Sequence, residues 1–230
     1  MGQRILPGNP PVEVNLKKST RARKISLRVS GLDGRVTLTL PRGISEREGM
    51  AFVQEKADWL RGHLDRQVGP VSVGIGAVLP VEGIDRVIQT GSGRGVRVDG
   101  GALIVSGRAD TAPRRVGAWL KTLARDRLAD ASDQYAAALG RPYTRLTLRD
   151  TRSRWGSCTA EGGLMYSWRL ILAPPDVLRY VAAHEVAHLE QMNHSADFWA
   201  VVERLYGPHK DARGWLRKNG PTLHSYRFGD

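Results

Sequence analysis

The sequence has little cysteine and no long apolar run. Its 230 residues include a single cysteine, Cys158, which excludes an internal disulfide and is typical of a reducing compartment. A membrane-spanning helix needs about 20 consecutive apolar residues, and no segment approaches that length. The first ten residues also lack the apolar centre of a secretory signal. We therefore expect a cytoplasmic protein with no membrane partner.

Acidic residues are scarcer than basic ones. The chain has 23 Asp and Glu against 35 Lys and Arg, which gives a net charge of +12. Residues 1–30 carry half of this excess, because seven basic residues there accompany one acidic residue. The basic run at residues 17–24 could bind nucleic acid or another polyanion. No nucleic-acid-binding motif accompanies it, so a solvated basic surface is the other interpretation.

Hydrophobic residues make up 41% of the chain, which is enough for a packed core in one large domain or two smaller ones. Residues 1–110 show mainly the two-residue period of strands. Three alternating runs predict antiparallel strands at residues 12–16, 25–29 and 36–40. We expect a hairpin turn at residues 31–34, a helix from Ser45 to about Arg66, and more strands within residues 77–106. This region is therefore predicted to be β-rich with one helix.

Residues 111–230 are predicted to form a second domain. A long helix is expected from about Thr111 to Gly140, and strands are expected at residues 145–149 and 164–170. The fold class that follows is α+β, with a β-rich amino-terminal region ahead of a domain that contains most of the helices.

The most informative segment is residues 184–194, HEVAHLEQMNH, which contains three of the six histidines. Prolines at residues 174–175 indicate the start of a helix. On that helix His184 and His188 are four residues apart, so both imidazoles can point at one position on the same face. Glu185 lies about 100° around the helix, where it can reach a water on the metal. The spacing predicts two zinc ligands and a general base.

His194 completes this site only if the helix ends before it. Because His194 follows His188 by six residues, a continuous helix would turn it roughly 240° away. Asn193 enters the left-handed backbone region at low cost, and Ser195 can N-cap a new helix. We therefore expect a turn that brings His194 back to the metal. Three histidines and one open position are typical of catalytic zinc, whereas structural zinc normally has four protein ligands.

Three segments resemble the YgjP-like metallopeptidase family, which is grouped near the SprT and WLM-type zinc peptidases. They are residues 154–158 (RWGSC), 180–189 (YVAAHEVAHL) and 193–199 (NHSADFW). The likeness is dense over about residues 115–220. It implies a small zincin-like (minigluzincin) catalytic domain in which His184, His188 and His194 bind zinc and Glu185 is the catalytic glutamate. Gluzincins commonly use a distant glutamate as third ligand, but Glu203 follows His188 too closely for that pattern.

These features predict a zinc-dependent metallopeptidase with one zinc ion per chain and a protein or peptide substrate. A zinc-activated water would attack the peptide bond, with Glu185 as the general base. One alternative is a metal-dependent nucleotide pyrophosphohydrolase on the same site, since a fold does not dictate a substrate. The other is a basic nucleic-acid-associated protein, including a protease that acts on DNA-bound proteins.

Residues near the cluster are candidates for substrate contacts. An extended peptide can pair with an exposed sheet edge through main-chain hydrogen bonds. Residues 164–169 are interpreted either as such an edge, which carries Tyr166 and Trp168, or as an ordinary buried strand. Arg154 could bind a substrate carboxylate or phosphate, or pair with a neighbouring acid.

Several other side chains have more than one interpretation. Cys158 could be a fourth zinc ligand, a redox-sensitive gate or a small buried side chain, and Phe198 and Trp199 are expected behind the metal. The candidates for accepting the second ring N–H of a ligand histidine are Asp197, Glu203 and Asp211. The candidates for an oxyanion donor, with ordinary core or surface roles as the alternative, are His209, His224 and Tyr226.

Overall fold

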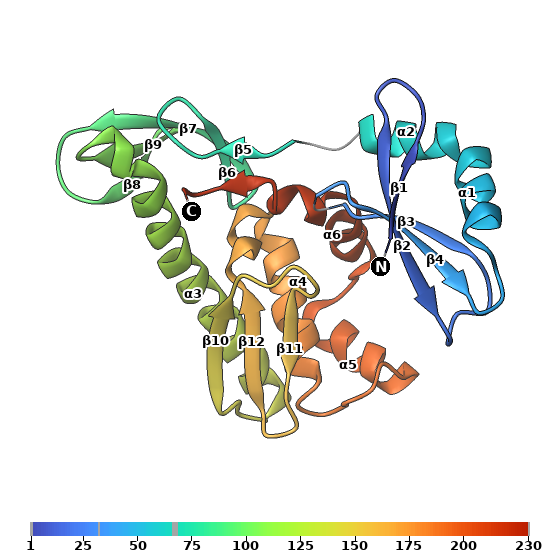
Figure 1. Ribbon diagram of the computed structural model, residues 1–230. Coiled ribbons are helices and arrows are strands. Elements are labelled where there is room, and N and C mark those ends of the chain that lie inside the picture. Colours follow the sequence, from blue (N-terminus) through green and yellow to red (C-terminus); the bar gives the residue numbers. More distant parts are fainter. Residues whose placement is uncertain (1, 32, 66–68, 230) are drawn as a thin grey trace. The chain divides into compact units, whose positions relative to one another are not determined.

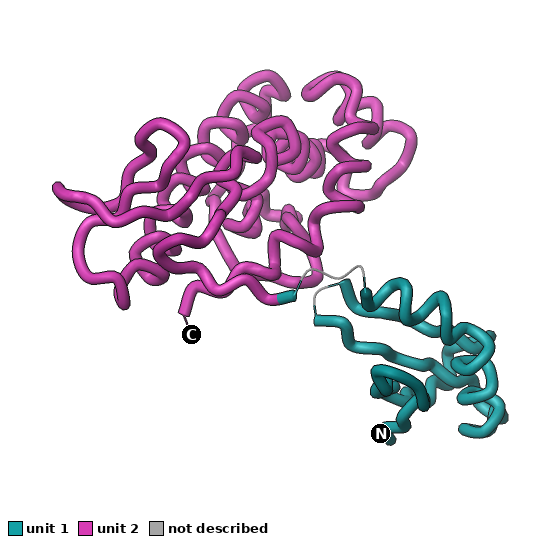
Figure 2. Tube along the Cα trace, turned by 90° about the horizontal axis from the view of Figure 1, so that it is seen from above, with its two compact units in different colours: residues 1–69 teal, residues 70–230 magenta. Residues whose placement is uncertain are grey.

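The computed structural model describes residues 2–31, 33–65 and 69–229 (Figure 1). The chain divides into two compact units, residues 1–69 and 70–230, which have separate colours in Figure 2. Each unit has its own cluster of buried apolar side chains, and the mixture of sheets and helices confirms the α+β prediction. Among the described residues, no helix has both the length and the apolar character needed to cross a bilayer.

Unit 1 contains a four-stranded sheet. Its strands in spatial order are β1 (Gln3–Leu6), β2 (Val12–Ser19), β4 (Val36–Pro41) and β3 (Ser26–Val29). The pairs β1–β2 and β3–β4 are antiparallel, but β2 and β4 are parallel. The prediction of three antiparallel strands is therefore wrong for β2 and β4. Apolar alternation determines which face of a strand is buried, but not which neighbour the strand pairs with.

Two helices share the core of unit 1. Ser45 starts α1 (Glu46–Glu55) with a capping box, in which its hydroxyl accepts from Glu48 N and the Glu48 carboxylate accepts from Ser45 N. A break at Lys56 separates α1 from α2 (Ala57–Asp65), so the single predicted helix is two. Arg66, at the predicted helix end, and Leu32, in the predicted hairpin turn, lie outside the described residues.

The predicted boundary near residue 110 falls inside unit 2. Unit 2 contains a second four-stranded sheet, in the order β6 (Val78–Val81), β7 (Ile84–Gly91), β9 (Ala102–Ser106) and β8 (Val96–Asp99). After the short 3-10 turn η1 (Ala109–Thr111) comes α3 (Ala112–Leu139). Leu103 of β9 lies in one buried cluster with Leu120 of α3. The sheet has no helix of its own to cover its apolar face, so it folds together with α3.

A three-stranded sheet follows, in the order β10 (Arg145–Arg149), β12 (Gly163–Ser167) and β11 (Gly156–Cys158). Strand β12 is central, parallel to β10 and antiparallel to β11. The interpretation of residues 164–169 as an exposed edge is therefore wrong, because β12 is paired on both sides and the chain continues into the 3-10 helix η2 (Trp168–Leu172). The edge strand in contact with α4 is β11 (Figure 1).

Three helices complete unit 2: α4 (Pro175–Ala187), α5 (Ala196–Tyr206) and α6 (Lys210–Leu223). Helix α5 ends at Gly207, whose φ of 93° is a conformation that favours glycine. Helix α6 is absent from the sequence prediction because Gly214, Gly220 and Pro221 are poor helix formers. Strand β13 (Tyr226–Arg227) then pairs in parallel with β5 (Val71–Ser72), which returns the end of the chain to the start of unit 2.

Arg169 in η2 joins the second half of unit 2 to this carboxy-terminal segment. Its guanidinium is buried and bonds both carboxylate oxygens of Asp150, at 2.6 and 3.0 Å. Its Nη1 donates to the carbonyl oxygens of Leu223 and Tyr226, at 3.0 and 3.1 Å. One buried cation therefore satisfies acceptors from three separate parts of the fold.

We expect Arg169→Ala to lower the free energy of unfolding by about 3 kcal/mol, because it removes a buried cation and leaves the Leu223 and Tyr226 carbonyls without their donor. Arg108→Ala is the matched control. Arg108 also pairs with an aspartate, Asp110, but its side chain is 82% exposed, so its loss should change stability by less than about 0.5 kcal/mol. Urea unfolding of both variants tests this; equal effects would contradict a structural role for the Arg169 network.

Candidate metal centre

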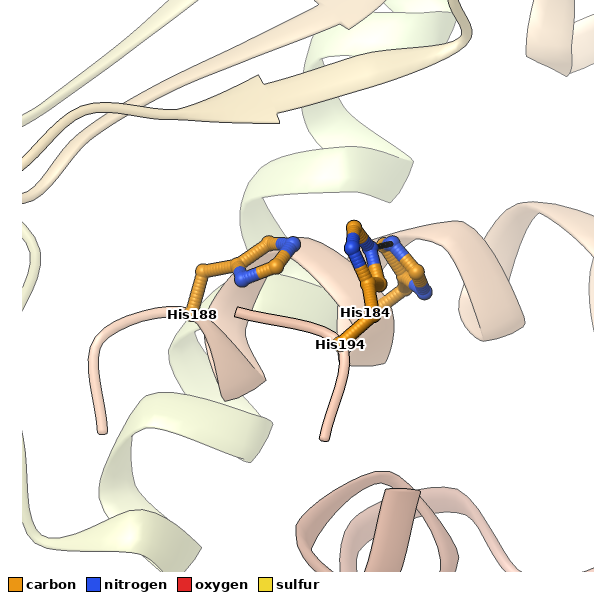
Figure 3. A group of neighbouring side chains, drawn as sticks. All are labelled: His184, His188 and His194. Atoms are coloured by element: carbon orange, nitrogen blue, oxygen red, sulfur yellow. Dashed lines mark hydrogen bonds between the residues drawn. The ribbon is translucent and has the colours of Figure 1, made fainter. Parts of the chain in front are cut away.

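Helix α4 presents the first two histidines. His184 lies in its last turn, and His188 is its C-cap residue with φ −66° and ψ −15°. The helix is held in place by its apolar residues, with Val181, Ala182 and Ala183 all buried. Figure 3 shows the imidazoles of His184 and His188 on the same side of this helix, as their four-residue spacing predicts.

The helix ends with His188 as its C-cap, six residues before His194, so it stops ahead of His194 as expected. Leu189 and Gln191 bond back to Val186 and Ala187, which forms a tight turn after the last helical residue. Asn193 does not take the left-handed conformation that was expected, because Glu82 is the only non-glycine with a positive φ among the described residues. Its side chain instead accepts a hydrogen bond from Ser195 N at 3.1 Å.

The segment after this turn brings His194 back to the other two histidines. Ser195 N-caps α5, as predicted, and its hydroxyl accepts from Phe198 N. The ligand atoms of His184, His188 and His194 all lie within 4.8 Å of one another. His184 Nε2 and His194 Nε2 are 3.1 Å apart, the contact drawn in Figure 3. The three predicted ligands therefore form one group that could hold a metal ion.

A backbone carbonyl fixes the orientation of His188. Its Nδ1 lies 2.9 Å from the carbonyl oxygen of Gln191, and since a carbonyl only accepts, Nδ1 carries the proton. The lone pair is then on Nε2, which leaves that atom free to bind a metal. The predicted carboxylate acceptors do not take this role. Within the described part of the chain, Asp197, Glu203 and Asp211 form no hydrogen bond with a histidine of the cluster.

The electrostatic environment keeps two of the imidazoles neutral. Burial, together with the neighbouring His188 and His194, lowers the pKa of His184 to about 3. Burial also lowers the pKa of His188. Neutral imidazoles have lone pairs at neutral pH, so these two nitrogens can bind a metal without first losing a proton.

Glu185 points from α4 toward β11 and is 6% exposed. Its side chain lies against Gly156, where an added Cβ would be only 2.5 Å from Glu185 Oε1. Glycine is therefore required at residue 156 for the carboxylate to take this position. Burial raises the pKa of Glu185 to about 8, and the positive charge of Arg154 opposes the shift. Arg154 is thus brought near the predicted base, with its side chain exposed.

Aromatic rings enclose the histidines. Phe198 is fully buried, and its ring centroid is 4.5–4.9 Å from those of all three histidines, so its predicted place behind the cluster is confirmed. Tyr180 packs edge-on against His184 and stacks on His209, which also stacks on Trp199. His209 is the N-cap residue of α6. Its distance in the sequence from the other three histidines does not indicate that its ring lies next to their aromatic neighbours.

Other predicted site residues lie elsewhere. Tyr166 is fully buried and its hydroxyl is 3.0 Å from that of Ser132, while Trp168 is 4% exposed and packs edge-on against Phe228. Their assignment to substrate binding is wrong, because the central strand β12 and the turn after it direct these rings into the core. His224, one of the candidates for an oxyanion donor, packs against the ring of Trp155. Trp155 directly precedes Gly156 in the sequence.

Cys158 is half-buried in β11 and is not among the grouped ligand atoms of the cluster. Burial, with a contribution from Glu185, raises the pKa of its thiol to about 11. A thiol that holds its proton so firmly is a poor metal ligand and a poor redox sensor. The structure therefore favours the interpretation of Cys158 as a small buried side chain.

Comparison with known proteins gives two findings. The family model of the YgjP-like metallopeptidase domain matches residues 23–219. The crystal structure of the metallopeptidase zymogen of Pyrococcus abyssi abylysin is similar over 42% of this chain and 94% of that chain, at 20% sequence identity and a TM-score of 0.36. No curated protein sequence matches the chain.

The pKa of Glu185 predicts how stability depends on pH in the metal-free protein. The folded state holds the proton more tightly than the unfolded state, whose pKa is near 4.5. Stability therefore falls as the pH rises from about 4.5 to about 8. Metal-free Glu185→Gln has no proton to lose at this position. We therefore expect its free energy of unfolding, relative to that of the wild type, to increase by on the order of 3 kcal/mol from pH 5 to pH 8.5. Urea unfolding with a chelator present measures this. If the free energies of unfolding of the two proteins changed with pH in the same way, the prediction would be wrong.

Proposed function

This chain belongs to the YgjP-like metallopeptidase family, and we propose that it hydrolyses peptide bonds with one zinc ion held by His184, His188 and His194. The observation that carries the proposal is the convergence of three imidazoles, two of which come from the same helix as the buried carboxylate of Glu185. The nucleotide pyrophosphohydrolase remains the alternative to be tested.

The donor set suits zinc. Two nitrogens bound to one tetrahedral zinc ion, at about 2.0–2.1 Å each, lie about 3.3–3.4 Å apart. The separation of 3.1 Å between His184 Nε2 and His194 Nε2 is close to this value. Three imidazoles without a thiolate are the ligands of catalytic rather than structural zinc.

Glu185 is the proposed general base. Bound zinc supplies a Lewis acid that polarises the attacking water and the scissile carbonyl. Glu185 accepts the proton from that water and returns it to the leaving amine. A base with a raised pKa suits both steps, since it must take a proton and then give it up near neutral pH. Gly156 fixes the position of the carboxylate by leaving room for it.

The strand proposed to align the substrate is β11. It is the sheet edge in contact with α4, and Gly156 in this strand touches Glu185. A peptide that extends β11 by main-chain hydrogen bonds would pass directly beside the base. Arg154, one of the substrate-binding candidates, lies just ahead of this strand.

Glu185→Gln should keep the metal and lose at least about 100-fold in kcat, because the amide cannot accept a proton. His188→Ala and His194→Ala should instead weaken zinc binding by more than about 100-fold. Zinc content by elemental analysis and cleavage of quenched fluorescent peptides measure the two effects. Nucleoside triphosphates are assayed in parallel, and phosphate or pyrophosphate release with no peptide cleavage would favour the alternative.

Gly156→Ala tests the position of Glu185 separately from its chemistry. The new methyl group would overlap the carboxylate, so we expect kcat to fall at least tenfold while zinc content stays that of the wild type. Gly74→Ala is the control, because a Cβ there has no atom within 4 Å. Full activity in the residue 156 variant would show that the glycine contact does not position the base.

A further inference from the structure

A pocket of about 580 Å³ lies beside the metal centre. It is lined by Trp155, by Tyr180 and by Lys210, Arg213, Gly214 and Arg217 of α6. Tyr180 is one helical turn ahead of His184, and the two ring centroids are 6.0 Å apart. Trp155 directly precedes Gly156, which touches Glu185. Side chains near a bond under attack at Glu185 would therefore lie within reach of this pocket.

One wall of the pocket is strongly basic. Lys210, Arg213 and Arg217 follow one another at three- and four-residue spacing, so they share one face of α6. In the portion of the chain that the structure describes, no carboxylate forms an ion pair with any of the three. Arg213 is oriented by its packing over the ring of Trp199, at 4.7 Å. Asp211 lies about 100° around the helix from Lys210 and does not share the face.

The same face has room for a ligand. Gly214 lines the pocket together with these cations, and a Cβ added there would meet no atom within 4 Å. Glycine in the middle of a helix is less favourable than alanine. The glycine at residue 214 therefore lowers the stability of α6, and the pocket is wider than it would be with a side chain there. The rings of Trp155 and Tyr180 provide an apolar part of the lining.

We propose that this pocket binds a carboxylate of the peptide substrate, either an acidic side chain or the terminal carboxylate. The proposal rests on the proposed peptidase function and names its substrate class. Unpaired guanidinium and ammonium groups bind carboxylates through charge-assisted hydrogen bonds. An apolar wall suits the aliphatic stem of a glutamate better than a phosphodiester backbone, and this favours a peptide over nucleic acid.

The test measures binding without turnover. Zinc-loaded full-length Glu185→Gln is titrated with fluorescein-labelled, amidated alanine peptides that contain two Glu, two Gln or two Lys, and anisotropy gives each affinity. A further alanine peptide with a free carboxyl terminus is compared with its amide. We expect one carboxylate source to bind about tenfold more tightly than its neutral counterpart. Which source does so distinguishes a side-chain site from a terminus site.

Charge reversal on α6 provides the control. Adding Lys210→Glu and Arg217→Glu should abolish the preference, whereas Lys218→Glu, the same change on an exposed residue that does not line the pocket, should keep it. Gly214→Leu should also reduce it by filling the space. Equal binding of acidic and neutral peptides, or an equal effect of Lys218→Glu, would overturn the proposal. So would a single-stranded DNA oligonucleotide that competes for the pocket more strongly than the acidic peptides.

The wild-type enzyme separates this proposal from the proposed function. If the wild type cleaves none of the peptides while binding to Glu185→Gln still depends on the carboxylate, the peptidase proposal is wrong and the proposal of a carboxylate-binding pocket is supported. If it cleaves acidic and neutral peptides with equal kcat/KM and binds them equally, the peptidase proposal stands and the pocket proposal fails.

Discussion

The metal centre depends on the end of α4 at His188. In a continuous helix His194 would point away from the first two histidines, so three nitrogens could not meet. The turn after His188 does two things at once. It lets the Gln191 carbonyl accept from His188 Nδ1, which leaves Nε2 for the metal, and it redirects the chain so that His194 Nε2 comes within 3.1 Å of His184 Nε2. The Asn193 and Ser195 side chains then start α5, whose Phe198 supports all three rings.

The contact between α4 and β11 makes the second half of the site. A glutamate one residue after a ligand histidine is useful only where something holds its carboxylate, and here Gly156 leaves the space that the carboxylate fills. Burial at this contact raises the pKa of Glu185, which destabilises the ionised form in the metal-free fold. The burial that suits the proposed general base therefore lowers the free energy of unfolding at neutral pH, a cost that is common at functional sites.

Helix α6 connects the metal centre to the proposed substrate pocket. It brings His209 into the aromatic cluster and presents Lys210, Arg213 and Arg217 beside Tyr180. Arg169 helps to hold the end of this helix through the Leu223 carbonyl. Residues that are remote in the sequence, from Trp155 to Arg217, therefore line one pocket beside the histidine cluster, and the proposed substrate site is larger than the histidine motif.

The local sequence determined those features of this protein that extend over only one or two helical turns. The four-residue spacing of His184 and His188, the adjacent Glu185, the N-cap at Ser195 and the predicted return of His194 follow from helix geometry and capping chemistry, and the structure groups the three histidines accordingly. Only the tertiary structure decided strand order, because apolar alternation is the same for a central and an edge strand; Tyr166 therefore lies in the core, on the central strand β12. It also decided that the edge strand against α4 is β11 and not β10, that Gly156 meets Glu185, and that α6, with its helix-breaking residues, forms a pocket wall. Those outcomes depend on packing between distant segments, which no local pattern encodes.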